Sequence, residues 1–305
     1  MLVLRPMESL MEPKIDDSRG VSERSAPLAT VVIPAHDEAK VIARLLRGLQ
    51  PLAEVPVEVL VVCNGCRDDS AAVARATGVP TQVVELAEAS KRLALERGDQ
   101  LAKAYPRVYI DADVVIDTPS VLALVSALQD GRYLAAGPQR QIVFDHANRL
   151  VRWYYDVWVR LPAVQSGLFG RGVIALSRVG AERVRRSPAL MADDLVASEV
   201  FEPTERIVVA AAQSTIYPPR TMRDLVRRRA RAATGNAQAD RHRLRRPESV
   251  TSPRTLLSIA WAEPVLFPKV FVFLGVALTA GAIARRAIRI EDFDTWQRDE
   301  SSRSG

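Results

Sequence analysis

Apolar stretches of strand length alternate with helical stretches over the first third of the chain, and this alternation constrains the fold more than any other feature. Residues 30–33 form an apolar strand pattern, and residues 38–49 follow with apolar side chains at helical spacing. The segments 57–62, 82–86 and 108–110 repeat the strand pattern, with helical segments between them. The alternation predicts a mainly parallel sheet that helices cover on both faces, an α/β fold. Ligands of such sheets bind beyond the carboxyl ends of the strands.

The chain has 305 residues, of which 48% are hydrophobic and 26% are charged, enough to bury a sizeable core. We expect a mobile leader over 1–27, an α/β domain over 28–236, and a helical extension over 237–305 that contains an apolar segment at 264–284 and a polar tail. The leader contains no apolar region typical of a signal peptide. Two cysteines are too few for a disulfide framework, so a cytoplasmic location is the default.

Polar side chains follow three of the predicted strands. The first strand runs into Pro34, Ala35, His36, Asp37 and Glu38, the second into Cys63, Asn64, Gly65, Cys66, Arg67 and Asp68, and the fourth into Asp111, Ala112 and Asp113. Carboxylates at strand ends suit hydrogen bonds to a base or a ribose, and they suit ligation of a hard divalent cation. An Asp-x-Asp sequence can equally cap a turn, so its function depends on the motifs around it.

Several motifs occur in a fixed order that resembles family 2 of the glycosyltransferases, over roughly residues 30–236. Pro34 to Glu38 match the Pro-x-x-Asp-Glu turn of that family, and 63–70 occupy its second strand end with Cys63 and Asn64 in place of acids. Asp68 is the surest match in that second motif. Lys91 begins a helix like the lysine-led helix of the family, and Ala192-Asp193-Asp194-Leu195 resembles its Glu-Asp pair.

This resemblance implies a GT-A fold, in which a Rossmann-like sheet is flanked by helices, and an inverting, metal-dependent transfer of one sugar from a nucleoside-diphosphate sugar to a hydroxyl acceptor. The acceptor would be a glycan or a lipid-linked molecule, and the cofactor Mg²⁺ or Mn²⁺. Asp113 would be the principal metal ligand. Asp194 would be the general base with Asp193 in support, although the pair could also cap a helix. The implied donor-binding residues are Pro34, Ala35, His36, Asp37, Glu38, Asn64, Asp68, Lys91, Asp111 and Ala112.

Two further segments have weaker signals. Gly167, Gly170 and Gly172 resemble an acceptor loop of the same family, but they could equally be turn glycines. Residues 220–246 contain ten arginines against two aspartates. Within that segment Arg228, Arg229 and Arg231 could bind the departing diphosphate, or they could belong to a solvated basic helix. Processive members of the family carry Gln-x-x-Arg-Trp here, and its absence favours a single-sugar transferase. Without interleaved aromatic residues we expect no nucleic-acid partner.

Cys63-x-x-Cys66 has the spacing of a zinc half-site, but no second pair exists and the three histidines lie far apart at 36, 146 and 242. We therefore interpret the cysteines as small residues in a tight nucleotide-binding turn, with His36 a neighbour of the base and not a proton-transfer group.

The apolar segment 264–284 is long enough to span a membrane, but Pro268 and Lys269 interrupt it and leave an unbroken apolar run of only 15 residues, Val270 to Ala284. Arg285 and Arg286 follow. We expect an interfacial helix that makes a peripheral contact with anionic lipid at the cytoplasmic face of a membrane.

Three other functions stay open at this stage. A retaining transferase of the same fold would share the metal motif. A sugar-phosphate nucleotidyltransferase would need a glycine-rich loop after the first strand, which residues 34–38 do not provide. A non-catalytic basic scaffold for membrane or nucleic acid would use only the arginine cluster, and substitution of Asp113 or Asp194 would then change nothing measurable.

Overall fold

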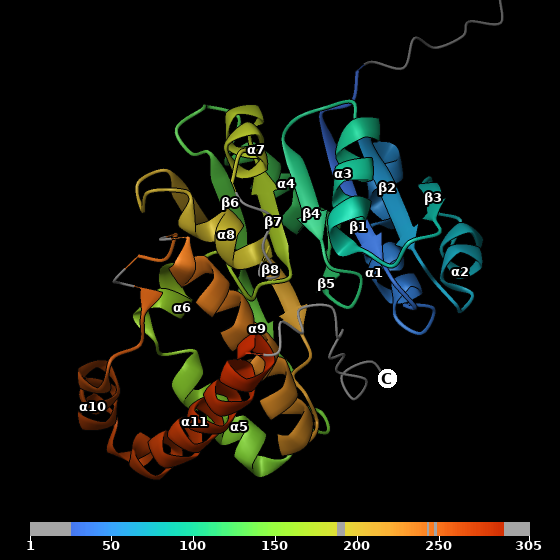
Figure 1. Cartoon of the computed structure of the whole chain (residues 1–305). Helices are drawn as coiled ribbons and strands as arrows, with labels where there is room; N and C mark the ends of the chain where they lie inside the picture. The colour runs from blue at the N-terminus through green and yellow to red at the C-terminus, as the bar shows by residue number, and fades with distance from the viewer. Residues whose placement is uncertain (1–25, 188–192, 243, 247–248, 290–305) are drawn as a thin grey trace, which may run out of the picture.

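The structure of the protein is a computed structural model that describes residues 26–187, 193–242, 244–246 and 249–289. An eight-stranded sheet in the order β3-β2-β1-β4-β7-β6-β8-β5 forms the centre (Figure 1). β1, β2, β3, β4, β6 and β8 run parallel, while β7 and β5 run antiparallel to their neighbours. The predicted mainly parallel sheet is therefore confirmed. The strands are β1 Ala29–Ala35, β2 Val57–Asn64, β3 Gln82–Leu86, β4 Arg107–Ile110, β5 Val115–Ile116, β6 Ala135–Ile142, β7 Val173–Leu176 and β8 Arg206–Ile216.

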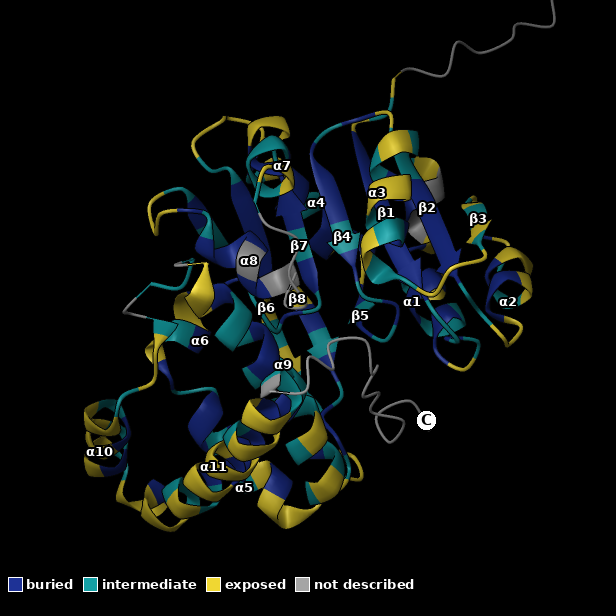
Figure 2. Cartoon of the chain, in the orientation of Figure 1, coloured by how far each residue is buried: buried dark blue, intermediate teal, exposed yellow. Residues whose placement is uncertain are grey.

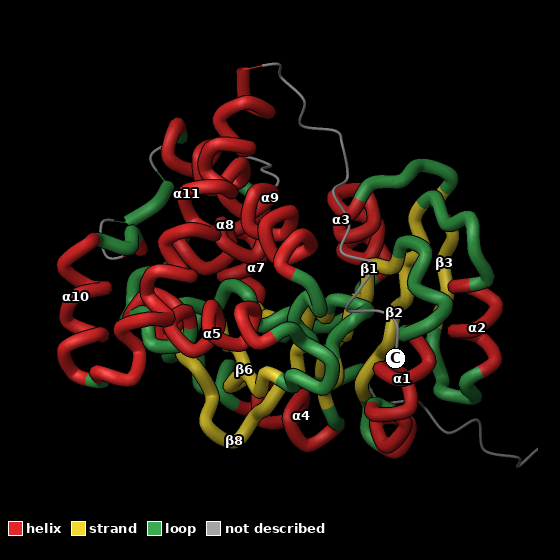
Figure 3. The backbone as a smooth tube through the Cα atoms, turned by 90° about the horizontal axis from the view of Figure 1, so that it is seen from below, coloured by secondary structure: helices red, strands yellow, loops and turns green. Residues whose placement is uncertain are grey.

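Helices cover both faces of the sheet, with α3 on one face and α1 and α4 on the other (Figure 3). The helices are α1 Ile42–Gly48, α2 Ser70–Ala76, α3 Lys91–Leu101, α4 Thr118–Ser126, α5 Arg149–Trp158, α6 Pro162–Ser166, α7 Arg178–Arg185, α8 Asp193–Glu199, α9 Met222–Arg241, α10 Pro253–Ala262 and α11 Phe267–Arg289. The helix expected over 38–49 begins only at Ile42. Asp37 lies in the left-handed region with φ 49°, and the Glu38 backbone N–H donates to the Ser70 hydroxyl, so the chain is held in a turn before the helix starts.

Pro34 occupies a central strand, where its missing N–H would ordinarily leave a gap in the ladder. The Thr30 N–H points toward β4, since it donates to the Pro106 carbonyl, and alternation along the strand points position 34 to the same side. The pairing of β1 with β4 ends at Val32 opposite Tyr109, before Pro34 is reached. The proline therefore lies just past the part of β1 that pairs with β4, at the place where β1 and β4 separate.

The buried residues form a large core between the sheet and its helices, and a second core among the helices of the C-terminal half (Figure 2). The second core joins α5, α9, α10 and α11, and the Tyr154 ring stacks on the Phe273 ring with centroids 5.0 Å apart. These helices gather at the end of the molecule away from β3 (Figure 1). The boundary expected at 236 falls inside α9. Of the expected leader 1–27, all but residues 26 and 27 lie outside the described chain, as do residues 290–305 of the expected tail.

Candidate functional site

The loops after β1 and β2 lie side by side because Ala35 pairs with Cys63 in the parallel ladder. Side chains of each loop bond the backbone of the other. The Asn64 amide donates to the Ala35 carbonyl at 2.8 Å, and the Asp37 carboxylate accepts from the Arg67 backbone N–H at 2.6 Å. Asn64 is buried, and its Oδ1 has no hydrogen-bond partner among the described residues. The predicted donor-binding motifs thus form one surface at the carboxyl ends of two strands.

The Asp68 side chain and the Glu38 backbone link the loop after β1 to the start of α2. The Asp68 carboxylate accepts from the Ala39 backbone N–H at 3.1 Å and from the Ser70 backbone N–H at 3.0 Å, and the Ser70 hydroxyl also donates to it. Glu38 is buried beside them. In this structure Asp68 therefore joins the start of α2 to the loop after β1.

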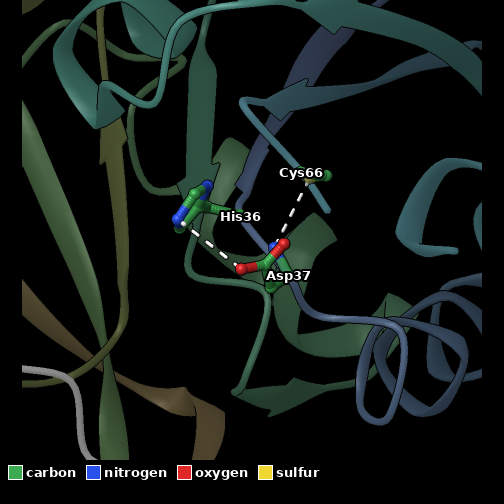
Figure 4. Close-up of side chains that lie close together, drawn as sticks. All are labelled: His36, Asp37 and Cys66. Carbon is green, nitrogen blue, oxygen red and sulfur yellow. Dashed lines mark hydrogen bonds and ion pairs between the residues drawn. The ribbon is translucent and has the colours of Figure 1, made fainter. Parts of the chain in front are cut away.

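His36, Asp37 and Cys66 gather at the front of the same surface (Figure 4). Their potential ligand atoms lie within 4.8 Å of one another. The His36 Nδ1 lies 2.5 Å from the Asn64 carbonyl, and the Asp37 backbone N–H donates to the Cys66 sulfur at 3.4 Å. The histidines are far apart in the sequence, which argues against a zinc site, but folding brings His36 close to Cys66. The hydrogen bonds within the group are enough to explain it as part of the turn.

Both cysteines are free, and they differ in their surroundings. Burial, followed by the neighbouring Cys66 thiol, raises the pKa of Cys63 to about 12. Cys63 therefore stays protonated at neutral pH, as expected of a small residue that fills the turn.

Asp111 and Asp113 follow β4 and lie on either side of the buried Ala112. The Lys91 ammonium donates to the Asp111 carboxylate at 2.8 Å, so the start of α3 reaches the end of β4. The Asp113 carbonyl accepts from the Arg44 guanidinium at 3.3 Å.

A pocket opens beside these aspartates. It lies between the end of β4, the glycine loop and α9. The residues that line it are Asp111, Asp113, Val114, Gly170, Gly172, Ile216, Tyr217 and Arg228. Of the three arginines expected to bind diphosphate, Arg228 lines this pocket. The Arg229 guanidinium lies over the Tyr154 ring, 5.9 Å from its centroid, on the side of the second core.

The glycine loop reaches the pocket because two of its residues adopt backbone angles that favour glycine. Gly170 and Gly172 have φ of 62° and 66°. A Cβ on Gly172 would lie 2.1 Å from the Val114 side chain. The Gly172 carbonyl accepts a hydrogen bond from the Asp111 backbone N–H at 2.8 Å. Gly167 has negative φ, and a Cβ there would meet the Phe169 ring and the backbone of α6.

Arg171, between those glycines, is a buried residue that the sequence did not single out. Its guanidinium donates to the carbonyls of Gly167 at 2.9 Å, of Pro138 at 2.8 Å and of Gln165 at 2.8 Å. The Pro138 carbonyl is available because the pairing of β6 with β8 shifts register after that residue. Burial lowers the pKa of Arg171 to about 10, which leaves it charged at neutral pH. Nothing in a Gly-Arg-Gly sequence indicates that the arginine points inward.

Asp193 and Asp194 begin α8, but their side chains lie outside the described part of the chain. α8 itself packs against the glycine loop, since the Leu168 backbone N–H donates to the Ser198 hydroxyl at 2.9 Å. The predicted base is therefore on a helix that contacts the loop lining the pocket.

Comparison with known proteins relates the first half of the described chain to a family. Residues 26–165 match the family model described as "Glycosyltransferase like family 2". No curated protein matches the chain.

Solved structures share the fold. The mannosyltransferase PcManGT from Pyrobaculum calidifontis, in complex with GDP-Man and Mn²⁺, aligns at a TM-score of 0.56 with 20% identity, over 91% of this chain and 85% of that one. Glucosyl-3-phosphoglycerate synthase from Mycobacterium tuberculosis, with Mn²⁺, UDP-Glc and phosphoglyceric acid, aligns at 0.51 with 20% identity, over 70% of this chain and 79% of that one. At these identities the likeness shows the fold alone, which is GT-A.

Proposed function

We propose that this chain, a glycosyltransferase whose residues 26–165 belong to glycosyltransferase family 2, transfers a single sugar with inversion. The donor would be a nucleoside-diphosphate sugar and the acceptor a hydroxyl group. The observation that supports this most is one pocket in which Asp111 and Asp113 face the same space as Arg228. Carboxylates and a guanidinium that converge in this way suit a diphosphate and the cation that accompanies it.

The residues at the pocket fit a divalent cation of the Mg²⁺ or Mn²⁺ kind. Asp111 and Asp113 offer only oxygen atoms, which such ions prefer, and phosphate and water can complete the shell. We assign Asp113 as the principal ligand from its position as the second aspartate of the Asp-x-Asp motif, and Lys91 pairs with Asp111 beside it. When bound, the cation would neutralise diphosphate charge. Two solved proteins of the same fold hold Mn²⁺ with a nucleotide sugar, which supports a divalent cation as the cofactor.

The remaining roles follow from position. The loops after β1 and β2 would hold the base and ribose through Asp37, His36 and Asn64. Lys91 would balance Asp111 and the phosphate charge. Arg228 would stabilise the negative charge that develops on the departing diphosphate, because a guanidinium can donate two parallel hydrogen bonds to phosphate oxygens.

An acceptor hydroxyl is a poor nucleophile at neutral pH, so a carboxylate must accept its proton as the sugar carbon is attacked. We assign that proton transfer to Asp194, with Asp193 in support, because α8 contacts the glycine loop through Ser198. Gly170 and Gly172, which line the pocket, would leave room for the acceptor. We place the reaction in the cytoplasm, with a glycan or a lipid-linked molecule as acceptor.

Nucleotide binding tests the donor half of the proposal. Titration calorimetry with UDP, GDP and dTDP, with and without Mn²⁺, should give metal-dependent binding of one nucleotide. Asp113→Asn should remove the metal dependence, while Asp130→Asn, the same change at an exposed turn, should not. Binding of no nucleotide by the wild-type chain would instead favour a non-catalytic scaffold.

Measurements of turnover and of product configuration test the catalytic half of the proposal. Asp194→Asn should lower kcat by roughly 10²- to 10⁴-fold while donor binding is retained, as expected for a general base. The product should have the anomeric configuration opposite to that of the donor. Retention of configuration would assign the chain to the retaining transferases of the same fold.

A further inference from the structure

α11 is apolar on two opposite faces. One face is buried against α5 and α9, through Phe273, Val276, Ala280 and Ala284. The other face points outward and carries large apolar side chains at intervals of four, three and four residues, which places them on one stripe of a helix. Its members are Phe267, Phe271, Leu274 and Leu278. A surface helix of a soluble protein would ordinarily carry polar residues on such a stripe.

α10 also has exposed residues (Figure 2), and two of them are large and apolar. Trp261 is 89% exposed and Leu257 66% exposed, compared with 62% for Phe271 and 70% for Leu278. α10 packs against the start of α11, so the two helices contribute to the same end of the molecule. The segment Pro264–Ile288 is long and apolar enough, by length and composition alone, to cross a membrane. Exposed apolar side chains gathered in this way mark an interaction site.

Positive charge adjoins this surface. Arg285 follows Leu278 on the outward stripe by seven residues, and Arg286 is exposed beside it. Arg254 is exposed at the start of α10. The sequence of α11 contains no acidic residue, so a second copy of the helix would offer these arginines no counter-charge. An anionic lipid headgroup would offer one, and tryptophan is favoured at the boundary between headgroups and acyl chains.

We propose that the outward stripe of α11 with Leu257 and Trp261 of α10 docks on the surface of an anionic phospholipid bilayer, with α11 lying parallel to the membrane plane. This docking proposal rests on the proposed function only where it suggests that the acceptor is lipid-linked.

The packing of α11 favours this orientation over a span. Near its start the Lys269 ammonium is paired with the Asp156 carboxylate of α5 at 2.7 Å. Glu263, just before the helix, accepts two hydrogen bonds from the Arg160 guanidinium, at 2.6 and 2.7 Å. α9, which covers the inner face, is rich in arginine. A span would draw these charged groups into hydrocarbon, where they lose their hydration, whereas an interfacial helix leaves them in water.

The orientation also relates the membrane to the pocket. α9 carries Arg228 into the pocket lining and packs against α11. The pocket would therefore lie one helix away from the lipid surface. That distance suits an acceptor hydroxyl on a lipid-anchored molecule.

Vesicle binding by the full chain tests the surface. Wild-type protein should co-sediment with vesicles of phosphatidylcholine and phosphatidylglycerol. Phe271→Gln with Leu278→Gln should reduce this partitioning by at least about tenfold, because each lost apolar side chain removes a large share of the transfer free energy. Val179→Gln, at an exposed apolar residue of α7, is the matched control and should bind like wild type. Arg285→Gln with Arg286→Gln should lose the preference for anionic over neutral vesicles, by about tenfold.

Orientation is read from Leu278→Trp, since position 278 is the middle of α11. Lipids brominated near the headgroup should quench its fluorescence more than lipids brominated deep in the acyl chain, after subtraction of the parent signal. Deep quenching would mean a span and would overturn the parallel orientation.

Two results would overturn the docking surface. One is equal vesicle binding by wild type and the Phe271/Leu278 variant. The other is a lipid-free dimer, seen by light scattering, that the same variant converts to a monomer. No donor or metal is present in these assays, so their failure leaves glycosyl transfer untouched, and failure to bind nucleotide leaves the membrane result intact.

Discussion

Replacing Arg171 with methionine should destabilise the protein and the pocket together. The guanidinium donates to three backbone carbonyls at 2.8 to 2.9 Å, and a methionine of similar length donates to none. A buried carbonyl left unpaired costs about 1–3 kcal/mol, so three give about 3 kcal/mol at the low end. Part of this cost is offset, because folding no longer has to strip the hydration shell from a charged guanidinium. We expect a net loss of about 2–4 kcal/mol.

Thermal unfolding followed by circular dichroism measures this loss, which corresponds to a fall in Tm of roughly 5–10 °C in a chain of this size. Arg97→Met removes an exposed guanidinium from α3 and should shift the Tm little. Arg171→Lys keeps the charge but cannot reach three divergent carbonyls, and it should fall between the two. Because Arg171 holds the loop of Gly170 and Gly172, nucleotide affinity should fall with stability in the methionine variant. A Tm for Arg171→Met within about 1 °C of Arg97→Met would refute the reasoning.

Three further changes have sharp outcomes. Gly172→Ala should lower the Tm more than Gly78→Ala, because both residues have positive φ but only the first would bring a Cβ against a neighbour; equal shifts measured by calorimetry would contradict the packing at the pocket. Iodoacetamide at pH 8 should alkylate Cys66 before Cys63, whose pKa is raised to about 12, and peptide mass mapping that finds Cys63 modified first would contradict its burial. Hydrogen bonds from its arginine partner lower the pKa of Glu263, so its contribution to stability is present above the ordinary glutamate pKa and lost as the pH falls through the lowered value. Glu263→Gln should therefore differ from wild type in Tm at pH 7 and converge with it in acid; a constant difference would contradict the pairing.

The sheet and its strand ends could be predicted from the sequence because their signal is local. A buried parallel strand must be apolar along its length, and a turn that faces a ligand must interrupt it with polar residues. β3 was located at residues 82–86 from this pattern alone, and Asp111 and Asp113 were placed directly after β4. Helix starts were less predictable. α1 begins at Ile42 because the Glu38 backbone is bonded to Ser70, which is distant in the sequence.

The features that the sequence did not reveal depend on contacts between distant segments. Arg171 looks like any surface arginine until β6 shifts register at Pro138 and presents a carbonyl to it. Arg228 and Arg229 are neighbours with the same chemistry, yet a helix turns successive side chains by 100°, so one lines the pocket and the other covers Tyr154. α11 illustrates the same point, because composition indicates only that it is apolar. α5 and α9 cover one stripe of α11 and leave the other exposed. This arrangement favours a position of α11 at the lipid surface over a position across the bilayer.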